Sequence, residues 1–130
     1  MHFFGKNFEK CPYRLNRRTF MKQLSEKSFK DLAEMTLVLA ERFFMARRLS
    51  QLEEEEYIAE SDSYIEECHF FLKKVSDAFN TLNESEKNLI NNEFFFQNYH
   101  NWWETIYSKA TFYRYKKSAM IKFLGAFYHD

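Results

Sequence analysis

The chain contains very few residues that break helices. Among 130 residues there are two glycines and one proline. Sheets and barrels need frequent turn residues, whereas a few long helices need almost none. This scarcity predicts an all-α protein. The length suits a single domain, or one helical body with a small C-terminal unit.

The chain also lacks the usual signs of disulfides and membrane segments. Its two cysteines, Cys11 and Cys68, belong to no Cys-x-x-Cys motif and to no cluster with histidine. No apolar run is long enough for a signal peptide or a membrane span. We therefore expect a cytoplasmic protein without membrane association. Cys68 lies on an apolar stripe and is expected to be a small core residue.

Sequence motifs for catalysis are missing as well. There is no glycine-rich phosphate loop, no Gly-x-Ser-x-Gly elbow and no Cys/His dyad. The four histidines are scattered, and Glu66 and His69 form a single Glu-x-x-His pattern, which a di-metal helical bundle needs twice. We expect no enzyme, no metal site and no cofactor.

What the chain does have is apolar side chains and unevenly distributed charge. Hydrophobic residues make up 45% and aromatic residues 20%, enough for a sizeable core. The 19 basic and 19 acidic residues cancel, but residues 109–130 hold five basic residues and one acid. Residues 53–67 hold eight acids and no Lys or Arg. A neutral chain of this kind can still bind a polyanion locally. The acidic stretch is either a solvated helix face or a docking surface for a basic partner.

Residues 1–18 contain Gly5, Pro12 and scattered basic and aromatic residues, which predict a basic arm. Apolar periodicity predicts a helical hairpin over residues 19–80. The first helix of the hairpin is expected over 19–52. The second starts at about residue 57 or 62 and ends at 80, after a polar junction.

The first of these helices contains a wider apolar step between Ser25 and Phe29. This step indicates a break, and either Ser25 or Ser28 is suited to cap the helix that restarts after it.

Residues 81–130 are expected to form a unit of three helices. Asn83 and Glu86 have the spacing of a capping box, which predicts a helix over 84–97. Asn101 is placed to cap a following helix of one or two turns.

The last helix is expected over 109–127 with Ser108 as its N-cap. Apolar residues define one face of it, and basic and hydroxyl side chains define the other. A DNA recognition helix needs this arrangement, because its inner face packs on the protein and its exposed N-terminal residues enter the major groove. Lys and Arg then neutralise phosphates or read guanine edges. The residues expected to contact DNA are Lys109, Thr111, Tyr113, Arg114 and Lys117, with Lys116 and Lys122 nearer the phosphates.

The same helix carries a longer pattern, namely Ser108, Thr111, Phe112, Tyr113-Arg114, Lys116-Lys117, Ala119 and Phe123-Leu124. With this pattern, residues 79–127 resemble the C-terminal helix-turn-helix, region 4, of sigma-70-type RNA polymerase factors. The resemblance is nearest to the sigma-like regulators of Gram-positive phages and their small relatives in mycoplasmas. It implies DNA binding at promoter or operator sequences, with contact to RNA polymerase.

The chain departs from that family at the first helix of the motif. Trp102-Trp103-Glu104-Thr105-Ile106 replaces the usual Glu-Ile-Ala helix, and Tyr107 stands where the turn commonly has glycine. The two tryptophans are either core residues or a platform for stacking bases.

Two hypotheses on function follow. The first is a DNA-binding transcription regulator whose partner is double-stranded DNA, acting as a homodimer because recognition by one short helix is weak. The alternative is a helical adaptor that binds a protein, with RNA polymerase as the candidate, and has no DNA affinity of its own. A second basic group is either a phosphate-binding patch or part of a solvated arm. It consists of Arg14, Arg17, Arg18 and Lys22.

Overall fold

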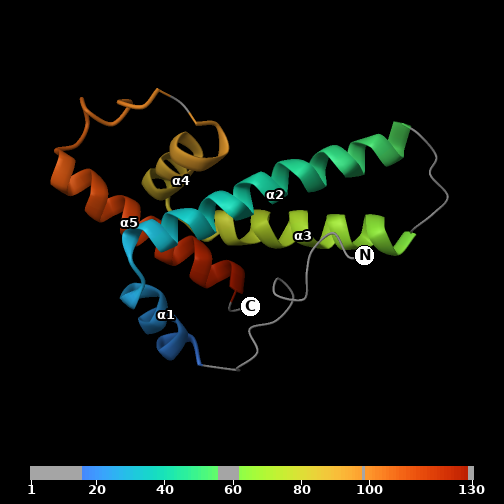
Figure 1. The fold of residues 1–130 in the computed structure, drawn as a ribbon, viewed down its shortest axis with the longest axis horizontal. Helices are drawn as coiled ribbons and strands as arrows, with labels where there is room; N and C mark the ends of the chain where they lie inside the picture. The colour runs from blue at the N-terminus through green and yellow to red at the C-terminus, as the bar shows by residue number, and fades with distance from the viewer. Residues whose placement is uncertain (1–15, 56–61, 98, 129–130) are drawn as a thin grey trace.

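The computed structural model describes residues 16–55, 62–97 and 99–128. Every regular element in these ranges is helical, which confirms the all-α class (Figure 1). No helix in these ranges is long and apolar enough to cross a membrane. Most of the predicted arm and most of the polar junction lie outside the described residues. The elements are α1 (Arg17–Glu26), α2 (Phe29–Glu55), α3 (Asp62–Asn80), α4 (Glu84–Ile90), a π-helical turn η2 (Asn91–Phe95) and α5 (Lys109–Tyr128).

The helix expected over 19–52 is interrupted where the apolar spacing widens, so that it forms α1 and α2. The Ser28 hydroxyl accepts a hydrogen bond from the Asp31 backbone N–H at 3.1 Å. Ser28 is therefore the residue that caps the restart. Ser25, the other candidate, instead donates its hydroxyl proton to the carbonyl of Lys22 at 2.6 Å.

α2 and α3 pack along each other (Figure 1). The buried residues of one apolar cluster include Leu39 and Ala46 of α2 and Cys68, Phe71 and Val75 of α3. Cys68 is only 1% exposed, which confirms its expected place in the core. Burial of a large apolar side chain contributes about 1.5–3 kcal/mol, so this contact is a main source of stability.

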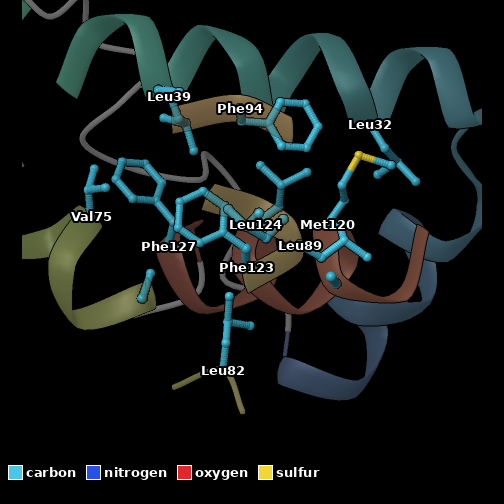
Figure 2. Packing of buried hydrophobic residues seen from close by; sticks show 14 of the residues in the cluster. Leu32, Leu39, Val75, Leu82, Leu89, Phe94, Met120, Phe123, Leu124 and Phe127 are labelled. Carbon is cyan, nitrogen blue, oxygen red and sulfur yellow. The ribbon is translucent and has the colours of Figure 1, made fainter. Parts of the chain in front are cut away.

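α5 is the helix around which the others are arranged. It contacts α1, α2, α3 and α4. Phe123 and Phe127 on its C-terminal half are fully buried. Figure 2 shows side chains of several elements converging on one cluster that contains both rings. The whole helical body, and not one neighbouring helix, therefore fixes the position of α5.

α4 begins with the predicted capping box. Asn83 Oδ1 accepts from the Glu86 N–H and Glu86 Oε1 accepts from the Asn83 N–H, both at 2.9 Å. The helix does not continue to residue 97 as an α-helix, because it passes at Asn91 into the π-helical turn η2. A hydrogen bond from the Phe96 N–H to the Asn91 carbonyl, 2.7 Å, closes this turn. Gln97 follows with a φ of 43°, a left-handed conformation typical of helix ends.

Residues 100–106 form a run of turns, and the short helix expected after Asn101 is wrong. The Glu104 N–H donates to the Asn101 carbonyl at 3.1 Å and the Ile106 N–H to the Trp103 carbonyl at 2.9 Å. These bonds span three residues, whereas an α-helix needs a continuous series spanning four. Packing of the aromatic side chains onto neighbouring elements, described below, takes precedence over local helix formation here.

Candidate nucleic-acid interface

α5 has two halves with different surroundings. Its C-terminal half lies in the core, whereas its first turns extend past the start of α2 (Figure 1). Lys109, Tyr113 and Arg114 are exposed there, and Lys117 is half-buried. These four residues are called the α5 cationic face below. All four were expected to contact DNA.

The beginning of α5 is fixed by its predicted N-cap. The Ser108 hydroxyl accepts a hydrogen bond from the Thr111 N–H at 3.3 Å and donates its own proton to the Thr111 hydroxyl oxygen at 2.9 Å. Ser108 thus satisfies one of the unpaired N–H groups of the first turn. Thr111, expected to contact DNA, is part of this cap and is half-buried.

The basic residues of the α5 cationic face have no acidic partner among the described residues. The Arg114 guanidinium lies 5.5 Å from the centre of the Tyr115 ring, so it rests against an aromatic face and not a carboxylate. Tyr113 meets Phe29 edge-on, with ring centres 5.4 Å apart, and this contact links the face to the start of α2. Three unpaired cations and a phenol hydroxyl suit an anionic partner.

Lys116 is placed differently. Its ammonium donates a hydrogen bond to Glu93 Oε1 at 2.7 Å, and both side chains are 15% exposed. Three rings surround the ammonium, with centres 5.3 Å (Phe94), 5.4 Å (Phe29) and 5.9 Å (Phe112) away. Desolvated contacts between a cation and aromatic rings are attractive. Lys116 therefore joins α5 to η2, and its charge is neutralised inside the protein.

The two tryptophans hold the run of turns against this ion pair. The Trp102 indole N–H donates to Glu93 Oε2 at 2.9 Å. Trp103 stacks on Phe112, with ring centres 4.4 Å apart and an angle of 7° between the planes. Both tryptophans are half-buried. These contacts favour the interpretation of both tryptophans as core residues over a role in base stacking. They also fix the position of the segment before α5, although this segment is not helical.

Lys122 also has an internal partner. Its ammonium lies 2.6 Å from Glu86 Oε2, and the Glu86 side chain is 14% exposed. The other oxygen of Glu86 completes the capping box of α4. Lys122 thus links α5 to α4, and a phosphate at this position would compete with a formed ion pair.

Within the described ranges, no three His, Cys, Asp or Glu residues are placed to hold a metal ion. The Ser50 hydroxyl and His69 Nε2 are 2.7 Å apart, a hydrogen bond that joins α2 to α3. Sequence reasoning did not find this pair, because no local pattern connects residues 19 positions apart.

The structure thus divides the seven predicted contact residues. It brings Lys109, Tyr113, Arg114 and Lys117 together at one end of α5 and ties the other three into the protein. No family model matches the chain, and no significantly similar curated protein or solved structure was found.

Proposed function

We propose that this protein binds double-stranded DNA through the α5 cationic face and regulates transcription. The observation that carries the proposal is the division of α5. One half is locked into the core, and the other presents cations that have no acidic partner among the described residues. A helix presented in this way matches the major groove, which is about 12 Å wide and admits one α-helix.

The charge distribution supports fewer DNA-contacting residues than the seven predicted from the sequence. Arg114 and Lys117 lie three residues apart on one side of α5, so both can reach a single stretch of duplex. Tyr113 can donate its hydroxyl to a phosphate from the flank. The proposed DNA contacts are Lys109, Tyr113, Arg114 and Lys117, and recognition by one helix favours a homodimer on two half-sites.

The test is a fluorescence anisotropy titration of a labelled mixed-sequence duplex, repeated at salt concentrations between about 50 and 200 mM. We expect affinity to fall steeply with salt. The Arg114→Ala/Lys117→Ala variant should lose about 1.8 from the magnitude of the log–log slope, because each phosphate contact contributes about 0.9. Absence of binding by the unmodified protein at the lowest salt would sink the proposal.

Arg47→Ala/Arg48→Ala is the matched control. It removes the same charge from exposed positions of α2. These positions lie about 27 Å along α2 from its start, where Phe29 meets the α5 cationic face. We expect its affinity and slope to stay close to those of the unmodified protein. An equal loss in both variants would indicate a general charge effect and contradict the proposed site.

A second candidate function, protein binding as an adaptor, is favoured by an aromatic groove. The groove lies between α2, α3 and η2 and has a volume of about 340 Å³. Phe44 and Phe96 at its edge are 39% and 69% exposed. Arg47 also lines the groove, so its charge favours an apolar helix that carries an acidic residue.

The candidate partner for this groove is RNA polymerase. Binding of the purified protein to core RNA polymerase can be measured by biolayer interferometry. We expect Phe44→Ser/Phe96→Ser to weaken it at least about tenfold if the groove is used, since exposed aromatic side chains dominate interface energies. Unchanged binding in the variant would show that the groove is not the binding surface. Absence of binding by the unmodified protein would exclude the adaptor function.

A further inference from the structure

The packing of α1 on α5 places further basic side chains next to the part of α5 that follows the cationic face. α5 has a glycine, Gly125, at the point of contact. A Cβ atom built there would meet the Sδ atom of Met21 and would lie 3.7 Å from Leu24 Cδ1. The missing side chain thus allows α1 to lie close against the C-terminal half of α5 (Figure 1).

Two contacts give the relative direction of the chain segments. Met21 and Leu24 meet α5 at Gly125, whereas Phe29, just after the corner, meets α5 at Tyr113. Residue numbers therefore rise along α1 while they fall along α5. α1 covers the part of α5 that follows the cationic face, and its corner ends next to that face.

The side chains of α1 carry unpaired positive charge. Arg18 and Lys22 are four residues apart, so they project from one side of α1, and Met21 lies between them in the sequence. Both are exposed, and neither has an acidic partner within the described part of the chain. Asn16 caps the helix by accepting from the Thr19 N–H at 2.8 Å, which fixes the start of α1.

The length of the combined surface decides what fits it. From Lys109 to Gly125 the α5 axis runs about 24 Å, at about 1.5 Å per residue. Duplex DNA carries one phosphate per about 1.7 Å of axis, so a strip of this length spans about seven base pairs. A single acidic side chain of a protein partner would meet only one end of it.

We infer that α1, through Arg18 and Lys22, contacts backbone phosphates of the same duplex whose groove receives the α5 cationic face. The inference rests on the proposed function. α1 then positions the protein on DNA without reading sequence, as phosphate contacts do, while α5 reads the base edges. This would make the bound site longer than one recognition helix covers.

The test compares Arg18→Ala/Lys22→Ala with the unmodified protein in the salt titration of a labelled mixed-sequence duplex. We expect the slope to lose about 1.8 in magnitude, equally for every duplex sequence, because phosphate contacts carry no sequence information. Circular dichroism verifies that the helices are intact. Arg18→Gln/Lys22→Gln keeps longer side chains and serves as the second variant if the alanine variant unfolds.

The outcomes separate the two proposals. No duplex binding by the unmodified protein overturns the proposed function itself. Duplex binding with an unchanged slope in both α1 variants overturns only the role of α1. Hydroxyl-radical footprinting gives an independent readout, since the α1 variants should lose protection at one edge of the site. If the unmodified protein bound anionic vesicles or duplex RNA as tightly as duplex DNA, and the α1 variants lost that binding to the same extent, DNA would be replaced as the proposed partner.

Discussion

The Lys116 ammonium and the Glu93 carboxylate form an ion pair of 2.7 Å in which each side chain is 15% exposed. It lies directly beside Lys117, a residue of the α5 cationic face. One basic residue thus holds α5 in place, whereas its neighbour in the sequence has no acidic partner among the described residues.

Lys116→Met should lower the free energy of unfolding by about 2–3 kcal/mol, because it leaves the Glu93 carboxylate poorly solvated and unpaired. Its affinity for DNA should remain unchanged. Lys117→Met is the matched control and should do the reverse, weakening DNA binding with a change in stability within about 0.5 kcal/mol. Urea unfolding and duplex titration of both variants provide the measurement, and loss of DNA affinity in Lys116→Met alone would contradict the assignment.

Trp102→Phe should destabilise the protein by about 1.5–3 kcal/mol, since it removes an N–H donor to a charged acceptor while keeping a ring. Hydrogen exchange should become faster over residues 99–107. Trp103→Phe keeps a ring that can stack on Phe112 and is expected to cost less. If the two variants unfolded at the same temperature, the hydrogen bond to Glu93 would carry no special weight.

Gly125→Ala tests the close approach of α1. Replacing glycine by alanine within a helix normally stabilises it by about 1 kcal/mol. Here the new methyl group meets Met21, so we expect that gain to be lost and the amides of α1 to exchange faster. The double variant Gly125→Ala/Met21→Ala removes the clash but also some packing. We expect the amides of α1 to exchange more slowly than in Gly125→Ala, but faster than in the unmodified protein. Full gain in the single variant would show that Met21 moves aside at no cost.

Burial raises the pKa of Tyr128 above its usual value of 10.0, and the Arg42 charge opposes this shift. The folded state therefore favours the neutral phenol. Its contribution to stability is complete below pH 10.0 and is lost as pH rises through the raised pKa. Tyr128→Phe should flatten the fall in melting temperature as the pH rises above about 10. An identical fall in the variant would show that other groups cause it.

Local patterns were sufficient to predict much of the fold. The widened apolar step, the capping box at Asn83 and the N-cap at Ser108 all describe events within four residues, and the structure confirms each of them. Apolar periodicity likewise located α3 and α5, because a buried stripe repeats every 3.6 residues.

Contacts between distant segments could not be predicted in the same way. Glu93 and Lys116 are 23 residues apart, and no spacing rule connects them. The expectation of a short helix after Asn101 failed for the same reason, since Trp102 and Trp103 are held by η2 and α5. The candidate site was therefore predicted as a face of one helix. Only the packing showed which of its lysines form ion pairs with acidic side chains of the protein.

The division of α5 also separates two kinds of sequence constraint. Lys109, Arg114 and Lys117 are not part of the buried cluster, whereas Phe123 packs on Phe95 of η2 and Phe127 packs on Phe71 of α3. The exposed turns can therefore change their ligand preference while the fold stays intact. A library randomised only at the exposed positions should yield mostly folded proteins, so the proposed DNA contacts can be varied without loss of the fold.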